Sequence, residues 1–353
     1  MAVVTTSIYE TTGNGIDTGE DRNWILGGPD LPTVQIWTTT GDGFHSTARH
    51  LEVRNYAHIE TGHGAGAVLA AKYQTWLNKP GGDVGGQTGI LVAGAASLVS
   101  NDYGARIISY RSEGEAIRID VPGEVSATQV VNEGLITGAG TAIRSVSGVL
   151  YLKNMATGVI DGDVALSGRA NDVILNGGAI EGATSLGRGR DLYVGDGGTS
   201  GEVRGGRGAD KLVGGAGDDV LLGGRGDDVL RGGKGDDVLV GGRGRDVLKG
   251  GAGNDVFVFK DAGAIDTIRD FDPAQDAIRL ENAHFRKLGP EGMLDAGAFH
   301  IGRAAADADD RIIYDAKRGH LTYDANGSAP GGVKIIAKLD KGLDLAHHDF
   351  EII

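Results

Sequence analysis

The sequence predicts an all-β protein in which an N-terminal β-solenoid, or β-helix, continues into a parallel β-roll and ends in a small β-rich C-terminal module. The 353 residues include 63 glycines but only 5% aromatic residues. A thin-cored coil with many tight turns suits that composition better than a packed α/β core. A nine-residue unit also recurs in the second half of the chain, and longer units recur before it. We therefore expect four parts, covering residues 1–50, 51–204, 205–258 and 259–353.

Residues 1–50 show no repeat, and we expect them to form an N-terminal cap or an extended arm. Their apolar segment 3–9 (VVTTSIY) could add a strand to a neighbouring molecule. The first residues contain neither a basic region nor an apolar stretch of the kind found in signal peptides. Nowhere does the sequence approach the ~18 consecutive apolar residues of a transmembrane helix.

The repeat pattern in residues 51–204 predicts solenoid coils of roughly 19–24 residues, with short β runs and Asn/Gly corners. Asn132, Asn154 and Asn176 are spaced by 22 residues, with weaker echoes at Asn55 and near Asn101. We expect these asparagines to stack as a ladder inside a corner. Loosely repetitive strands of a β-sandwich are the alternative. Residues 72–88, with a proline and several glycines, read as an inserted loop.

Residues 205–258 are six uninterrupted copies of G-G-x-G-x-D-x-U-x, where U is a large apolar residue. This nonapeptide is typical of a parallel β-roll in which two copies make one coil, so that residues 18 apart stack at ~4.8 Å. The glycines form the turn, the aspartate points out of it, and U points inward. The predicted core is Leu212, Leu221, Leu230, Leu239, Leu248 and Phe257. A disordered Gly/Asp-rich linker, the alternative, would not need an apolar residue at every ninth position.

Stacked aspartates repel one another unless a cation lies between successive coils. Ca²⁺ takes ~6 oxygen ligands, which carboxylates and Gly-loop carbonyls can supply. We therefore predict several calcium ions, and we expect the thin core to fold only with them. No catalytic or other cofactor-binding residue is predicted. The predicted ligands are Asp191, Gly206, Gly208, Asp210, Gly215, Gly217, Asp219, Gly224, Gly226, Asp228, Gly233, Gly235, Asp237, Gly242, Gly244, Asp246, Gly251, Gly253 and Asp255.

These repeats resemble those of the repeats-in-toxin (RTX) family of secreted proteins. The resemblance implies that type I secretion machinery exports the chain without a cleaved N-terminal signal. It also implies folding in the calcium-rich exterior, and therefore a location outside the cell or on its surface. Independently, an acidic, glycine-rich chain is expected to stay unfolded without calcium, which suits passage through a channel. The solenoid region resembles, more weakly, the β-helical parts of bacterial adhesins and surface proteins.

The two outer faces of the roll differ in sequence. One face carries only apolar residues: Val220, Leu222, Val238, Val240, Val256 and Val258. The other is mixed: Lys211, Val213, Val229, Arg231, Val247 and Lys249. Because exposed apolar stripes usually mark contacts, we expect the C-terminal segment or another chain to cover the first face.

Residues 259–353 lose the glycine repeat. The run 265–280 (IDTIRDFDPAQDAIRL) and the final DFEII resemble the module that follows the roll in secreted RTX proteins. That resemblance implies a cap that carries an uncleaved export signal. From the residues alone, a β-rich cap is expected because unpaired strand edges invite aggregation, and a cap without a secretion role is the alternative.

The sequence shows no catalytic constellation. It lacks cysteine, H-E-x-x-H and G-x-S-x-G. The spacing of His50, His58 and His63 matches no common zinc site, and the tryptophans (Trp24, Trp37 and Trp76) fit core packing. The net charge of -14 disfavours nucleic acids and anionic membranes as partners.

The leading hypothesis is a non-enzymatic structural or adhesive extracellular protein. Solenoid ends, or the N-terminal strand, would allow it to assemble into homo-oligomers, filaments or matrix. The alternative is an extracellular polysaccharide-active enzyme, a lyase or epimerase on a β-helix. That alternative requires a groove along residues 50–200 with converging carboxylates and a basic residue. A third hypothesis is a calcium-gated secretion and folding module with an unknown binding domain.

Overall fold

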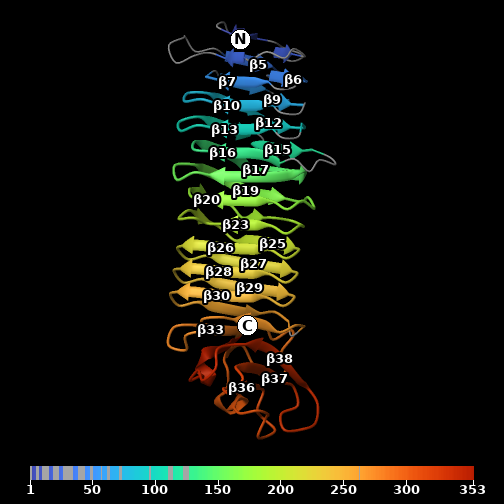
Figure 1. Cartoon of the computed structure of the whole chain (residues 1–353), viewed down its shortest axis with the longest axis vertical. Coiled ribbons are helices and arrows are strands. Elements are labelled where there is room, and N and C mark those ends of the chain that lie inside the picture. The colour runs from blue at the N-terminus through green and yellow to red at the C-terminus, as the bar shows by residue number, and fades with distance from the viewer. Residues whose placement is uncertain are drawn as a thin grey trace. The chain divides into compact units, whose positions relative to one another are not determined.

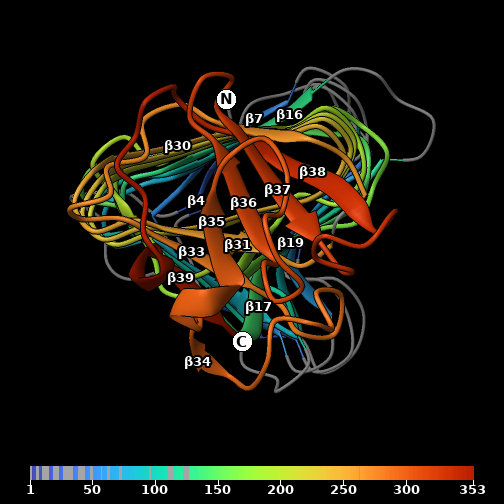
Figure 2. The same ribbon diagram turned by 90° about the horizontal axis from the view of Figure 1, so that it is seen from below.

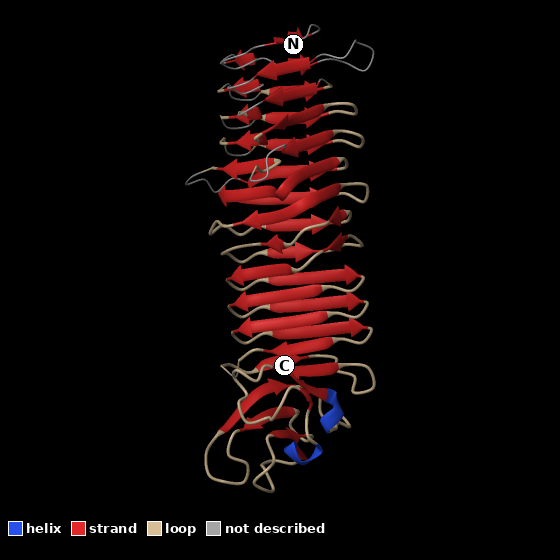
Figure 3. Ribbon diagram, turned by 180° about the vertical axis from the view of Figure 1, so that it is seen from behind, coloured by secondary structure: helices blue, strands red, loops and turns tan. Residues whose placement is uncertain are grey.

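The computed structural model describes the chain from residue 127 to 353 except residue 262, and shorter segments before it. These earlier segments are residues 2–4, 8–9, 16–18, 24–26, 35–38, 44–47, 51–56, 58–61, 64–70, 74–94, 97–109, 114–121. The chain divides into two compact units, residues 1–201 and 202–353. Strands make up nearly all the regular structure, and the only helices among the described residues are two short 3₁₀ turns, η1 (Ala296–Ala298) and η2 (His347–Asp349) (Figure 3).

The first unit is a parallel β-solenoid whose coils contribute strands to three columns (Figure 1). The first column is β1 (Ala2–Val4), β4 (Trp24–Leu26), β7 (Glu52–Asn55), β10 (Thr75–Asn78), β13 (Leu98–Asn101), β16 (Ala127–Asn132), β18 (Val149–Asn154), β20 (Val173–Asn176) and β23 (Leu192–Val194). The second is β2 (Ile8–Tyr9), β5 (Gln35–Thr38), β8 (His58–Thr61), β11 (Asp83–Gly86), β14 (Arg106–Ser109), β17 (Leu135–Ser147), β19 (Val159–Leu166), β21 (Ala179–Ile180) and β24 (Thr199–Ser200). The third is β3 (Ile16–Thr18), β6 (Phe44–Ser46), β9 (Ala65–Leu69), β12 (Thr88–Val92) and β15 (Ile117–Asp120), which pairs with β17, followed by β19 and β22 (Thr184–Ser185).

The solenoid prediction is confirmed, and the β-sandwich alternative is wrong because all these pairings are parallel. One local expectation also fails. Residues 74–88 are not an inserted loop, since they contain β10, β11 and the start of β12, with a turn at Pro80 and Gly81. The strands described within residues 1–50, expected to form a cap or an arm, pair in the same three columns. Proline and glycine mark a corner of the coil here, whereas the sequence alone does not distinguish a corner from an excursion.

An asparagine ladder runs along the end of the first column, as expected. In each step the side-chain Nδ2 of one asparagine donates to Oδ1 of the next at 2.8 to 2.9 Å. The ladder consists of Asn55, Asn78, Asn101, Asn132, Asn154 and Asn176, all of which are buried. It includes one residue that the sequence placed in a loop, Asn78. Because each buried amide both donates and accepts, the column satisfies itself without charge.

The aromatic and histidine expectations are tested only in part. Trp76 is fully buried and packs edge-on against Phe44 with ring centroids 5.5 Å apart, so its core role is confirmed. The side chains of Trp24, Trp37 and His58 lie outside the described part of the structure. His50 and His63 lie outside it entirely.

The second unit begins with two parallel columns of roll strands. One is β25 (Val203–Arg207), β27 (Val220–Arg225), β29 (Val238–Arg243) and β31 (Val256–Phe259). The other is β26 (Lys211–Ala216), β28 (Val229–Lys234) and β30 (Val247–Ala252). Partners lie 18 residues apart as predicted, and all six predicted core residues, from Leu212 to Phe257, are fully buried.

The C-terminal segment adds strands to both roll columns. β33 (Ala277–Leu280) pairs with β31, and β39 (Phe350–Ile352) then pairs with β33 on one side and with β34 (Gly292–Met293) on the other. β32 (Asp266–Ile268) pairs with β30 and then with β38 (Val333–Lys338). Figure 2 shows β36 (Ile312–Asp315), β37 (His320–Asp324) and β38 side by side, with β35 (Phe299–Ile301) paired to β36. The last roll strands are therefore not open edges.

The apolar outer face of the roll, which we expected to be covered, is covered only in part, and its residues form a stripe from Val220 to Val258. Val240 and Val258 are 7% and 6% exposed, whereas Val220 at the other end of the stripe is 37% exposed. Leu222, Val238 and Val256 are half-buried. Burial therefore rises along the stripe in the direction of the C-terminal segment, and the expectation of full cover is not met at Val220.

Candidate metal centre

Each nonapeptide turn of the roll depends on backbone that only glycine adopts easily. The glycines at the second and fourth positions of the repeat have positive φ, for example +110° at Gly224 and +134° at Gly226. L-residues with a side chain rarely adopt this region. These two glycines make the chain reverse direction between one sheet and the other.

The aspartate of each repeat turns into the protein, which corrects the expectation that it points out of the turn. The six side chains, Asp210 to Asp255, are at most 7% exposed. Oδ1 of Asp228 accepts a hydrogen bond from the backbone N–H of Asp210 at 2.8 Å, and Oδ1 of Asp237 accepts one from Asp219 at 2.9 Å. The backbone N–H of a repeat aspartate thus holds the carboxylate of the aspartate 18 residues later, in the next coil. Two columns of aspartates form in this way, on opposite edges of the roll.

The first glycine of each repeat makes room for this carboxylate. A Cβ added to Gly223 would lie 2.5 Å from Oδ2 of Asp228, and the first glycines of the other repeats meet their own aspartates in the same way. We did not predict this role, although the signal was present as an unvarying glycine. The first glycines are Gly205, Gly214, Gly223, Gly232, Gly241 and Gly250.

The second carboxylate oxygen is the feature that indicates a cation. Within the described structure, Oδ2 of Asp228, Asp237 and Asp246 is buried and has no hydrogen-bond partner. Burial, with a smaller contribution from neighbouring aspartates, raises the pKa of Asp228 and of Asp237 to about 7. Burial likewise raises the pKa of Asp219 and of Asp246 to about 6. Unpaired buried carboxylates are costly, and a bound cation removes that cost.

The donors suit calcium. No group of three or more His, Cys, Asp or Glu side chains that could hold a metal occurs among the described residues. A cation between coils would therefore take carboxylate oxygens from the aspartates and further ligands from carbonyls of the glycine turns. Such an all-oxygen set fits Ca²⁺ and lacks the nitrogen or sulfur ligands that zinc prefers.

The aspartate columns extend past the repeat at its C-terminal end. The backbone N–H of Asp246 donates to Asp266 at 2.9 Å, and that of Asp255 donates to Asp276 at 3.0 Å. Burial raises the pKa of Asp266 to about 8. Sequence reasoning missed both residues because their spacings are 20 and 21 residues rather than 18.

A shorter column of the same kind lies in the first unit. The backbone N–H of Asp172 donates to Oδ1 of Asp191 at 2.8 Å, and that of Leu150 donates to Asp172 at 2.7 Å. Burial raises the pKa of Asp172 to about 6. The predicted ligand Asp191 therefore occupies a setting like that of the roll aspartates, within residues that carry no complete nonapeptide.

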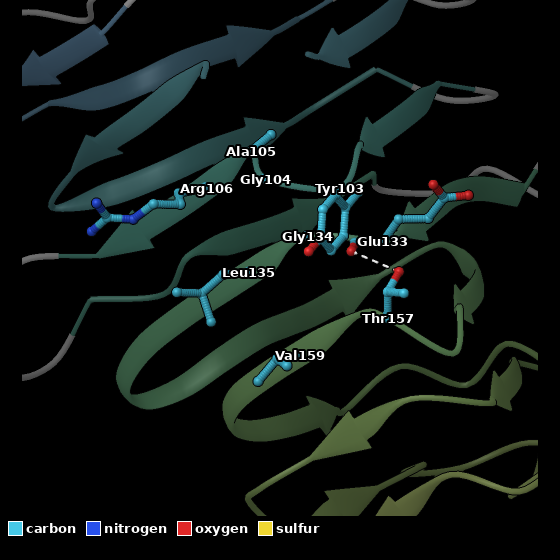
Figure 4. A pocket seen from close by; sticks show the side chains of 9 residues that line it. All are labelled: Tyr103, Gly104, Ala105, Arg106, Glu133, Gly134, Leu135, Thr157 and Val159. Atoms are coloured by element: carbon cyan, nitrogen blue, oxygen red, sulfur yellow. Dashed lines mark hydrogen bonds between the residues drawn. The ribbon is translucent and has the colours of Figure 1, made fainter. Parts of the chain in front are cut away.

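A cavity of about 410 Å³ in the first unit is where a polysaccharide-active site could be sought. Tyr103, Leu135 and Val159 are among the residues that line it, and in Figure 4 the side chains of Arg106 and Glu133 point away from each other. Thr157 Oγ1 donates to the backbone carbonyl of Glu133 at 3.0 Å. This cavity does not bring together the converging carboxylates that the enzyme alternative requires.

Comparison with known families supports the metal assignment. The family described as the RTX calcium-binding nonapeptide repeat (4 copies) matches residues 202–230 and 231–259. No curated protein matches the chain. Among the described residues, no helix has both the length and the apolar character needed to cross a membrane. The two matched segments contain all six roll aspartates and all six first glycines.

Proposed function

From the premise that residues 202–259 are RTX calcium-binding repeats, we propose that this chain is a secreted protein with a structural or adhesive role outside the cell. Its roll folds when calcium binds after export by type I secretion machinery. The observation that carries the proposal is the set of buried carboxylate oxygens without partners at Asp228, Asp237 and Asp246.

Different groups of the roll have different roles in holding calcium. Backbone N–H groups hold one oxygen of each aspartate, the first glycine gives the carboxylate its space, and the second oxygen is left for the cation. Bound calcium supplies the charge neutralisation that the thin apolar core does not. When calcium is scarce, the buried carboxylates of the roll oppose its folding, and the roll stays unfolded until the chain has been exported.

The structural or adhesive part of the proposal is supported by the amount of solenoid in the chain. Parallel columns run through the first unit, and solenoids present long regular surfaces and strand ends to partners. Assembly through the solenoid ends or through the N-terminal strand β1 would make such a chain a matrix or filament component.

Calcium titration of the full chain, followed by far-UV circular dichroism and calorimetry, tests the folding step. The wild type should gain β signal with calcium. The Asp237→Asn variant should need several-fold more calcium, because it loses a charged oxygen ligand. The matched control is Asp236→Asn in the same turn, where the exposed side chain keeps its acceptor Oδ1 for Asn254.

Two results would contradict the proposal. A full β signal and an unchanged melting temperature in excess chelator would show that the chain folds without calcium. Equal calcium affinities for the Asp237→Asn and Asp236→Asn variants would show that the buried aspartates are not calcium ligands. For assembly, electron microscopy and light scattering at millimolar calcium are decisive, and a monomer under those conditions would refute filament or matrix formation.

A further inference from the structure

One edge of the roll carries a column of exposed arginines. Arg207, Arg225 and Arg243 occupy the third position of alternate repeats, and the strand register places each directly beside the next. Neighbouring strands lie ~4.8 Å apart, so the three guanidinium groups follow one line along the roll. All three side chains are exposed.

These arginines have no carboxylate partner among the described residues. The exposed aspartate of the same turns, Asp227, pairs with Arg245 at 3.3 Å. The repeat aspartates of these turns, Asp210, Asp228 and Asp246, are buried, and the calcium sites of the proposed function would neutralise them. An unpaired guanidinium offers a planar fork of donors that matches a carboxylate or sulfate.

The opposite edge of the roll differs, although it is built from the same repeat. Its third positions are Ala216, Lys234 and Ala252, also in register. Its fifth positions include two exposed aspartates, Asp218 and Asp236. A continuous column of cations at the third position therefore occurs on one edge only, since the opposite edge has a single lysine, Lys234, between two alanines.

We propose that the arginine column of Arg207, Arg225 and Arg243 binds a linear acidic polysaccharide bearing carboxylate or sulfate groups. Such a polymer carries its anionic groups at short regular intervals along an extended chain, as the column carries its cations. Phe257 and Phe259 on the last roll strand β31 are buried, so the edge has no aromatic surface on which nucleic-acid bases could stack.

Binding on this edge depends on calcium. The three arginines lie 18 residues apart in sequence and come into line only when the roll forms. Without bound cations, the buried aspartates behind them and the net charge of -14 repel a polyanion. Calcium therefore both aligns the column and weakens the opposing field of the aspartates behind it.

The test is binding of chondroitin sulfate to the full chain, measured by calorimetry in calcium and in chelator. Dextran is the neutral polymer and duplex DNA the competing polyanion. The test variant combines Arg207→Ala, Arg225→Ala and Arg243→Ala. Alanine already occupies the equivalent position at Ala216 and Ala252, so the turn accepts it. The matched control removes three other cations through Arg231→Ala, Lys234→Ala and Lys249→Ala.

In calcium, the wild type and the control should bind chondroitin sulfate alike. The test variant should bind about 30-fold more weakly, at about threefold per exposed charge pair. Binding should weaken as salt rises, because the Debye length at physiological salt is only ~8 Å. Chelator should abolish binding.

Several outcomes would overturn the proposal: no binding of the wild type in calcium, equal losses in the two variants, equal binding of dextran, or tighter binding of duplex DNA. Circular dichroism of the same samples separates this result from the proposed function. A roll that folds with calcium but does not bind the polymer refutes only the polysaccharide site.

Discussion

Calcium removal should make the stability of the roll depend on pH in an unusual direction. Burial raises the pKa of Asp228 and of Asp237 from an ordinary value of 3.8 to about 7 in the folded chain. Each shift corresponds to about 4 kcal/mol, at ~1.4 kcal/mol per pH unit. Both side chains are at most 1% exposed, so solvent screens these charges little. Two such groups oppose folding by an amount comparable to the ~5–15 kcal/mol stability of a whole domain.

The direction of this pH dependence follows from whether the folded or the unfolded chain binds the proton more tightly. Because the folded pKa lies above the unfolded one, the destabilisation is complete above about pH 7. It diminishes as the pH falls from about 7 toward 3.8. The calcium-free roll should therefore be more stable at pH 5 than at pH 8. With saturating calcium the order should reverse, because protons compete with the cation for the same oxygens.

Thermal melting of the full chain by far-UV circular dichroism, with and without calcium at pH 5 and pH 8, measures this reversal. The melting temperature without calcium should rise on acidification, and the melting temperature with calcium should fall. The reasoning would be refuted if the calcium-free chain melted at the same temperature at both pH values, or if it were more stable at pH 8.

Two further predictions concern single side chains. In Gly223→Ala, the new Cβ would meet Asp228 Oδ2 at 2.5 Å, so calcium affinity should fall and the roll should lose about 1–3 kcal/mol of stability. Gly140→Ala is the control, because no atom lies within 4 Å of its new Cβ. Equal melting temperatures for the two variants would contradict the role of the first glycine in making room for the carboxylate. In Asn132→Ala, buried ladder partners lose their hydrogen bonds, so the solenoid should lose about 1–3 kcal/mol by chemical denaturation, with or without calcium. Exposed Gln129→Ala on the same strand should have little effect, and a similar loss there would show that the ladder is not the cause.

The sequence predicted the roll in detail because the nonapeptide constrains it at several positions. Register, inward residues and the identity of the aspartates follow from a fixed 18-residue period, and Leu230 is buried where that period places it. The direction of the aspartate did not follow. Its inward turn depends on the missing Cβ of the first glycine, such as Gly223, and on a backbone N–H one coil away, which no spacing shows.

Where the period changes, prediction weakens. Asp266 and Asp276 complete the aspartate columns from a segment without the glycine repeat, and a backbone path of different length brings them there. Asn78 was missed for a related reason, because the proline and glycines after it suggested an excursion from the coil. In both cases the three-dimensional period is constant while the number of residues per coil is not.

The two kinds of column explain why the two units should respond differently to calcium. An asparagine such as Asn132 accepts from one neighbour and donates to the other, so the amide column is complete and neutral. An ionised aspartate such as Asp228 can only accept. It takes one backbone N–H and keeps a second buried oxygen unsatisfied, so the carboxylate column is incomplete without a cation. The amide ladder should therefore hold the first unit folded in chelator, while the roll unfolds. Chelation should then produce a partial loss of β signal, with hydrogen-exchange protection lost in residues 205–258 and kept around the asparagine ladder. Uniform protection, or uniform loss, would show that the chemistry of the columns does not determine which unit needs calcium.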